Sequence, residues 1–380
     1  MERNDPVRQR RRPRRSAILI AAGLYLALPA CTAEPAAPVF TESAPDPLAA
    51  AFGAAVEEAD VPGGAIAVRR DGETRVVPVG VADVAGAAVT EDTLFAYRSV
   101  TKSLVTTVVL QLADEGVIDL DSPVPTAGTG VDGDASVSEL ATMTSGIPNY
   151  SAQPGLGGLL TAQWDRSWTD TTLYALIDGV PASFAPGSSY QYSNTNTVLL
   201  GQLISDRSGR GWDEAVAERL TDPYEMDSVV YPGDRLPPPG TATGFQIDED
   251  GTAEALPPVR ASAFSAAGGM FGTAADLATW AEILGTGAAV SADAHRLRTE
   301  VLARTDADPA SPEYDAYGFG IGRLDRWIGH TGSGLGFQSL AMYHSDTGTA
   351  VAIVVNATGP DSDLPARILQ DLEEEILQER

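Results

Sequence analysis

Two short, largely apolar segments near the start of the chain have the character of β-strands. Residues 65–68 and 75–81 are rich in β-branched side chains, and Asp71-Gly72 lies between them. An Asp-Gly pair between two such runs is typical of a β-hairpin, because both residues tolerate the left-handed backbone of a tight turn. The pattern also predicts a helix just before this hairpin, over residues 48–59. A sheet therefore begins early in the chain.

A second pair of strand patterns lies near the C-terminus. Residues 337–343 and 349–355 are apolar runs, joined by the turn-forming Ser345-Asp346-Thr347-Gly348. The next segment predicts a helix, because its apolar residues share one helical face: Leu364, Ile368, Leu369, Leu372 and Ile376. Between the two pairs the sequence is mostly helical and loop in character. We expect an α/β (α+β) sandwich, with one antiparallel sheet built from N- and C-terminal segments and flanked by helices, and an inserted, mostly helical lobe. A cleft between sheet and lobe is the natural place for a site.

The first 31 residues have the pattern of an export signal. An arginine-rich start precedes an apolar run from Ala17 to Leu28. The segment Leu28-Pro29-Ala30-Cys31 resembles a bacterial lipoprotein box, in which the cysteine is lipidated and becomes the new N-terminus. Ordinary cleavage and secretion is the alternative, and Arg14-Arg15 also permits twin-arginine export. We expect an exported, extracytoplasmic protein that is lipid-anchored to the cell membrane through Cys31 or else secreted.

The expected domain organisation follows from the same patterns. Residues 1–31 are the export signal, and residues 32–47 are rich in Ala, Pro, Glu and Thr without periodicity, which is typical of a flexible tether. Residues 48–380 form the folded domain. Because Cys31 is the only cysteine, no intramolecular disulfide can form.

The chain is strongly acidic, with a formal net charge of -27. Seven of its 25 basic residues lie in the first fifteen positions, so the folded domain has an even larger excess of acidic groups. Such a surface repels the phosphates of nucleic acids, which bind to clusters of Lys and Arg. We exclude nucleic acid as a partner, and expect a membrane contact only through the anchor at Cys31.

Lys102 is the only lysine, and arginine supplies the other 24 basic positions. A guanidinium stays protonated in proteins, whereas a desolvated lysine amine can lose its proton and act as a base. Lys102 lies three residues after Ser99, at the start of an apolar helical stretch, so both side chains share one helical face. A nucleophilic Ser99 beside its activating base is therefore expected. A chance match with a surface lysine is the other interpretation of Ser-x-x-Lys alone.

Two further motifs carry groups suited to the same chemistry. In Tyr192-Ser193-Asn194 the phenol can relay a proton and the amide can bind a substrate amide; turn and packing residues are the alternative. In His330-Thr331-Gly332-Ser333-Gly334 the hydroxyls can bind a carboxylate, and glycine in an edge strand allows close approach of another backbone. A main-chain N–H near Ser333 can join that of Ser99 in an oxyanion hole. A hairpin with a core histidine is the other interpretation.

These three elements, in this order, resemble the S-x-x-K, Y-x-N and K/H-T-G motifs of the penicillin-recognising serine hydrolases, which include D-alanyl-D-alanine carboxypeptidases, class C β-lactamases and related esterases. The resemblance extends from about Gly64 to Ala357. The histidine of His330-Thr331-Gly332 is more similar to the secreted carboxypeptidases, because class C β-lactamases usually have lysine there. An unperturbed histidine attracts a carboxylate less than lysine does, and Arg323 is a candidate substitute.

The resemblance implies a role for each motif residue. Ser99 attacks an amide, ester or lactam carbonyl to form an acyl-enzyme, while Lys102 and Tyr192 share the proton transfers. Asn194 holds the substrate amide, and His330, Thr331, Gly332 and Ser333 line the carboxylate side of the cleft. No metal and no organic cofactor is needed.

The expected function is D-alanyl-D-alanine carboxypeptidase activity on peptidoglycan peptides. A β-lactamase or small-ester hydrolase is the nearest alternative, because deacylation rate separates these activities and no motif reports it. The substrate is thus a small peptide, a β-lactam or an ester. A penicillin-binding receptor without turnover is an alternative of another class. Loops between about residues 148 and 183 are expected to set substrate preference.

Overall fold

The structure is a computed structural model that describes residues 46–126, 134–306 and 308–379. The expected export signal, nearly all of the tether and the lipidation candidate Cys31 lie outside the described residues. Among the described helices, none combines the length and the apolar character that crossing a membrane requires.

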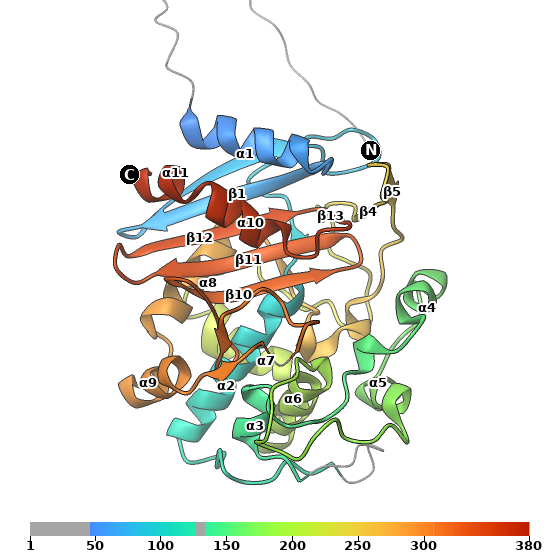
Figure 1. Cartoon of the computed structure of the whole chain (residues 1–380), viewed down its shortest axis with the longest axis vertical. Helices are drawn as coiled ribbons and strands as arrows, with labels where there is room; N and C mark the ends of the chain where they lie inside the picture. Colours follow the sequence, from blue (N-terminus) through green and yellow to red (C-terminus); the bar gives the residue numbers. More distant parts are fainter. Residues whose placement is uncertain (1–45, 127–133, 307, 380) are drawn as a thin grey trace, which may run out of the picture. The chain divides into compact units, whose positions relative to one another are not determined.

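An eight-stranded sheet is the centre of the fold (Figure 1). Its strand order is β2-β1-β12-β11-β10-β9-β8-β7, and each neighbouring pair is antiparallel. The strands are β1 (Gly63–Arg70), β2 (Glu73–Gly80), β7 (Ala303–Arg304), β8 (Ala316–Tyr317), β9 (Gly322–Leu324), β10 (Trp327–Gly334), β11 (Phe337–His344) and β12 (Thr349–Val355). Because β1 pairs directly with β12, the expectation of one sheet built from both chain ends is confirmed.

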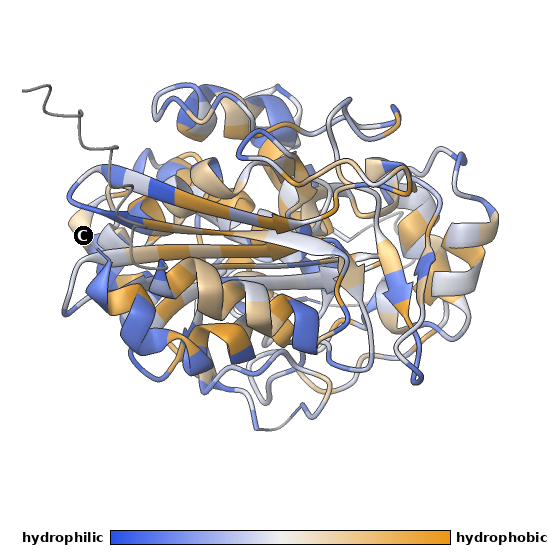
Figure 2. Ribbon diagram, turned by 90° about the horizontal axis from the view of Figure 1, so that it is seen from above, coloured by the Kyte–Doolittle hydropathy of each residue, from blue (hydrophilic) through white to orange (hydrophobic). Residues whose placement is uncertain are grey.

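Helices cover both faces of this sheet, as the view in Figure 2 shows. One face packs against α8 (Ala274–Thr286), and the other packs against α1 (Pro47–Glu58), α10 (Leu364–Asp371) and α11 (Glu373–Gln378). The strands alternate small and large side chains: Ala65 and Ala67 belong to the core on the α8 side, and Ile66 and Val68 to the other core. Successive strand residues point to opposite faces, so this alternation lets α8 lie close to the sheet.

The C-terminal segment forms two helices where the sequence predicts one. The backbone leaves helical geometry at Leu372 (φ -107°, ψ 16°), and α11 starts at the next residue. Three glutamates, Glu373, Glu374 and Glu375, occupy its first turn. Carboxylates are favourable at a helix N-terminus, where the unpaired N–H groups carry partial positive charge, so the sequence supports a new start here.

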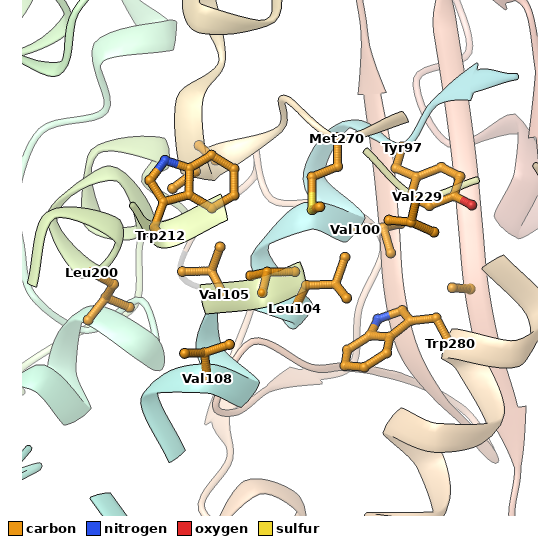
Figure 3. Close-up of a cluster of buried hydrophobic side chains, with 14 of the residues drawn as sticks. Tyr97, Val100, Leu104, Val105, Val108, Leu200, Trp212, Val229, Met270 and Trp280 are labelled. Carbon is orange, nitrogen blue, oxygen red and sulfur yellow. The ribbon is translucent and has the colours of Figure 1, made fainter. Parts of the chain in front are cut away.

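The middle of the chain forms the helical lobe around α2 (Thr101–Asp114). This helix is buried on nearly all sides, and Figure 3 shows Leu104, Val105 and Val108 among side chains from other elements. The other helices are α3 (Val137–Ala141), α4 (Leu156–Ala162), α5 (Asp170–Tyr174), α6 (Asn194–Ser208), α7 (Trp212–Val216) and α9 (Ala292–Glu300). Since α4 and α5 fall within residues 148–183, that region is partly helical and not only loop.

Short strands complete the fold and hold the start of α2. They are β3 (Phe95–Ala96) paired with β6 (Phe271–Gly272), and β13 (Ala357–Thr358), β4 (Phe245–Ile247) and β5 (Ala253–Ala255) in a three-stranded sheet. Single helical turns lie at Arg98–Val100, Tyr150–Ala152, Ala175–Ile177, Ala217–Thr221, Ala261–Ala263 and Ser265–Ala267. The turn at Arg98–Val100 connects β3 to α2, so pairing of β3 with β6 fixes where α2 begins.

Candidate active site

Ser99 lies in the turn between β3 and α2, at the boundary of the sheet and the helical lobe. The chain on either side of it is anchored: Tyr97 N–H donates to the carbonyl of Met270 at 2.9 Å, and Ser103 Oγ donates to the carbonyl of Val100 at 2.6 Å. Ser99 itself remains partly exposed, whereas Arg98 and Val100 are buried. The hydroxyl is thus presented to solvent from a rigid support, as a nucleophile requires.

Lys102 is fully buried and directed at Ser99. Its Nζ lies 2.9 Å from Ser99 Oγ, 2.5 Å from Asn194 Oδ1 and 2.6 Å from the carbonyl oxygen of Ala267. No carboxylate of the described residues forms an ion pair with it. Burial therefore lowers the pKa of Lys102 well below its ordinary value. A neutral amine at this position has a lone pair that can accept the Ser99 proton.

Asn194 opens α6 and contacts both Lys102 and the cavity in front of Ser99. Its Nδ2 donates to Ser151 Oγ at 2.5 Å, and its main-chain N–H donates to Asn149 Oδ1 at 3.1 Å. The side-chain bonds, from Lys102 to Oδ1 and from Nδ2 to Ser151, fix the amide plane. An amide nitrogen has two N–H donors, so one of them remains for a substrate.

Tyr192 lies next to the lysine, with Lys102 Nζ 5.0 Å from the centre of its ring. Its hydroxyl is buried and forms no hydrogen bond with a described atom. Burial raises the pKa of Tyr192 well above its ordinary value, and the Ser99 hydroxyl opposes that rise. The phenol is therefore a neutral O–H donor near Ser99, held without a competing partner.

The end of β10 lies against the turn that carries Ser99. A Cβ placed on Gly332 would be 2.5 Å from the carbonyl oxygen of Tyr97 and 2.8 Å from the main-chain nitrogen of Ser99, so only glycine fits here. Ser333 is exposed and lines the cavity. Thr331 is 6% exposed, its Oγ1 lies 2.7 Å from Tyr314 Oη, and it does not line the cavity. Of the two hydroxyls expected to meet a carboxylate, the structure brings only Ser333 to the cavity.

His330 lies behind β10, in the core, and does not line the cavity. Its Nε2 is 2.9 Å from Tyr317 Oη, and its Nδ1 is 2.5 Å from the carbonyl oxygen of Thr331. Burial lowers the pKa of His330 to about 3, and the charge of Lys102 adds to this effect. A neutral, enclosed imidazole gives no charge for a substrate carboxylate, so the placement differs from the expected one. Arg323, in β9, does not line the cavity either.

The cavity in front of Ser99 has a volume of about 280 Å³. Its walls are largely apolar on the helical-lobe side, where Leu156 and Leu160 of α4 face it. No carboxylate is among its described lining residues, and Arg98 is the charged side chain that lines it. The sequence patterns do not assign a role to Arg98, because it precedes Ser99 but is not itself part of any of the three motifs. Within the described residues, no three His, Cys, Asp or Glu side chains are grouped closely enough to hold a metal ion.

Comparison with curated proteins finds relatives that are named as a D-aminopeptidase and as a penicillin-binding protein. The chain is 26% identical to a D-aminopeptidase of Gluconobacter oxydans over 81% of this chain and 58% of that protein. It is 31% identical to penicillin-binding protein 4 of Amycolatopsis lactamdurans over 49% of each chain. The matches thus span about half to three-fifths of the length of these relatives.

Solved structures match over nearly their whole length. A D-stereospecific amidohydrolase from Streptomyces superposes with a TM-score of 0.73 at 29% identity, covering 85% of this chain and 98% of that one. A D-amino acid amidase from Ochrobactrum anthropi SV3 has the same fold, with a TM-score of 0.71 at 22% identity over 86% of this chain and 99% of its own. The Beta-lactamase family model matches residues 48–375, nearly the entire folded part. The resemblance seen in the three motifs is confirmed, and the chain belongs to the Beta-lactamase family.

Proposed function

We propose that this protein is a serine hydrolase that cleaves peptide or amide bonds on the carbonyl side of D-amino acid residues. The observation that carries the proposal is the bond between Ser99 and a fully buried Lys102 that lacks a carboxylate partner among the described residues. A lysine in that setting is held ready to lose its proton. An arginine in its place would keep its proton and could not act as the base.

The proposed reaction follows from the distances around Ser99. The neutral amine of Lys102 takes the proton from Ser99 Oγ as the oxygen attacks the substrate carbonyl, and the carbonyl electrons move to its oxygen. Main-chain N–H groups of Ser99 and Ser333 stabilise that oxyanion. When the C–N bond breaks, Tyr192 Oη gives its proton to the leaving nitrogen and is reprotonated from Lys102. Water then attacks the acyl-enzyme by the reverse proton route, which restores Ser99.

Preference for D-residues is supported by relatives and not by a motif. The Gluconobacter oxydans protein is called a D-aminopeptidase, and the Streptomyces structure is called a D-stereospecific amidohydrolase. These matches extend over more than four-fifths of this chain. Because the stereochemistry of a substrate is read by the whole cavity wall, likeness over the full domain supports this better than three short motifs do.

D-alanyl-D-alanine carboxypeptidase activity on peptidoglycan peptides is the second candidate. It is favoured by the positive charge of Arg98 and by the lack of a described carboxylate in the cavity wall, because a substrate with a free C-terminal carboxylate meets no repulsion there. A penicillin-binding protein that is acylated but turns over slowly shares the same geometry. A β-lactamase differs only in faster deacylation.

One set of measurements separates these activities. Purified protein and Ser99→Ala are incubated with benzylpenicillin, with the p-nitroanilides of D- and L-alanine, and with N,N′-diacetyl-L-lysyl-D-alanyl-D-alanine. Nitroaniline release from the D-anilide alone supports the D-stereospecific hydrolase, and D-alanine release from the tripeptide supports the carboxypeptidase. Intact-mass spectrometry reports the penicillin adduct: a long-lived adduct indicates slow turnover and rapid penicillin hydrolysis indicates a β-lactamase. No reaction of wild type with any of the four compounds contradicts the proposal.

A further inference from the structure

Arg98 precedes Ser99 and has an unusual conformation for its residue type. Its φ is 48°, in the left-handed region that non-glycine residues rarely adopt, and it is 4% exposed. Such a conformation persists only where surrounding contacts hold it, and it is concentrated near functional sites. The contacts of this side chain therefore indicate what the strained backbone is used for.

The guanidinium holds the turn that joins β10 to β11. Nε donates to the carbonyl of Gly334 at 2.8 Å, and Nη2 donates to the carbonyl of Leu335 at 3.1 Å. The turn is itself strained, because Leu335 has a φ of 40°. Two aromatic rings enclose the guanidinium: its central carbon lies 4.0 Å from the ring centre of Phe264 and 5.2 Å from that of Phe337.

Stability alone does not explain an arginine at this position. Arg98 forms no ion pair with a described carboxylate, and its Nη1 is buried without a hydrogen-bond partner among the described residues. Burial lowers the pKa of Arg98 to about 9. An apolar side chain of similar length fills such a space at lower cost, because no charge has to be desolvated. What arginine adds is a rigid pair of donors for two neighbouring carbonyls.

The two segments that Arg98 connects carry the main-chain groups of the reaction. Ser99 follows it directly, and Ser333 precedes Gly334. Because Gly334 and Phe337 form the pair that closes a two-residue turn, the alternating pattern directs the Ser333 N–H away from β11. Thr331 lies two residues before Ser333, so its N–H points in the same direction. That N–H donates to Tyr314 Oη and not to β11. Pairing with β9 ends at Gly329, so beside Ser333 that edge of β10 is open to the cavity.

We propose that Arg98 is a positioning residue, which fixes the separation between the main-chain N–H groups of Ser99 and Ser333 by tying the nucleophile turn to the β10–β11 turn. This role rests on the proposed function. A pair of donors aimed at a developing oxyanion loses its effect when either moves by a fraction of an ångström, whereas ground-state substrate binding depends on it little. The role thus predicts a defect in the chemical step and not in binding.

The test compares Arg98→Met and Arg98→Lys with wild type, using the substrate that wild type turns over fastest. We expect Arg98→Met to lower kcat about 10- to 100-fold while KM changes less than threefold. Affinity for phenylboronic acid, whose tetrahedral adduct with Ser99 places an oxygen in the oxyanion position, should fall by the same factor as kcat/KM. Arg98→Lys, which can still donate to one carbonyl, should recover part of the loss.

Arg298→Met is the matched control, since Arg298 is also buried, has no described ion-pair partner and does not line the cavity. Its Tm should change in the same direction and by as much as that of Arg98→Met, with kcat/KM near wild type. An Arg98→Met defect that lies in KM overturns the positioning role and assigns Arg98 to substrate binding. Equal loss of kcat in both variants overturns it in favour of a purely structural role. Wild type that fails to form any acyl-enzyme overturns the proposed function and this role together.

Discussion

Lys102 Nζ lies 2.9 Å from Ser99 Oγ, and the two residues are separated by one helical turn of the chain. The remaining contacts of the amine, Asn194 Oδ1 and the carbonyl oxygen of Ala267, come from segments 92 and 165 residues further along. Helix geometry therefore brings the two side chains together, and segments distant in sequence shield the amine of Lys102 from water. Both conditions are needed for a lysine to act as a base near neutral pH.

Replacing Lys102 by arginine is expected to abolish acylation while keeping a positive charge. A guanidinium does not give up its proton, so Ser99 loses its base, and acylation by benzylpenicillin should slow by about 10²- to 10⁴-fold. Rapid mixing followed by intact-mass spectrometry measures this rate. Lys102→Met should be equally slow. An arginine variant that acylates at the wild-type rate is incompatible with Lys102 as the base.

Acylation by wild type should depend on pH in the direction set by burial of Lys102. Because burial lowers the pKa of Lys102, the neutral amine is already present well below its ordinary titration range, and acylation should rise with pH through that lowered pKa and then level off. A pH profile of kcat/KM measures this acid limb. A rate that keeps rising through pH 10 instead means that the amine titrates with its ordinary pKa.

Tyr192→Phe is expected to separate activity from stability. The Tyr192 hydroxyl is buried without a described partner, so its removal leaves no other group unsatisfied and should change the free energy of unfolding by less than about 1 kcal/mol. If the phenol delivers the proton to the leaving group, kcat should nevertheless fall by about 10²-fold. Urea unfolding and steady-state kinetics measure the two effects. A large loss of stability with unchanged kcat assigns Tyr192 to packing.

His330 should make the fold sensitive to acid. Its pKa is about 3 in the folded protein and 6.5 in the reference state, so the unfolded chain binds more protons between these values. Stability is therefore complete above pH 6.5 and falls as the pH drops toward 3, by at most about 5 kcal/mol. His330→Gln should flatten this dependence in urea unfolding measured from pH 7 to pH 4. The half-buried His295 provides a control, and His295→Gln should leave most of the dependence in place.

Gly332→Ala is expected to reduce activity through the backbone of Ser99. The added methyl group would lie 2.8 Å from Ser99 N and 2.5 Å from the Tyr97 carbonyl oxygen, so the nucleophile turn and β10 must separate. We expect kcat/KM to fall at least about 10-fold. Gly53→Ala in α1 is the control: no atom lies within 4 Å of its added carbon, and it should stabilise the protein by about 1 kcal/mol without affecting activity. Wild-type kinetics in Gly332→Ala would show that activity does not require close packing of β10 against the turn that carries Ser99.

Much of this molecule is determined by local sequence. The hairpin of β1 and β2 and the strands β11 and β12 follow from short β-branched and apolar runs and from turn residues, because those signals act over a few positions. The same is true of the Ser99–Lys102 pair, whose spacing is a property of any helix. The fact that Lys102 is the only lysine further marks it as a residue whose chemistry arginine does not replace.

The tertiary structure decided what each of these groups can do. The sequence predicts a cavity-facing His330, but three tyrosine rings from other parts of the chain lie around it and leave it neutral and enclosed. Arg98 has no distinguishing motif, and its role appears only when the β10–β11 turn, more than 230 residues away, packs against it. Burial, pKa and the partner of a donor depend on segments distant in sequence, so no local pattern reports them. The sequence by itself identifies the residues that can carry the chemistry. Only the tertiary structure determines the burial and the partners of each one.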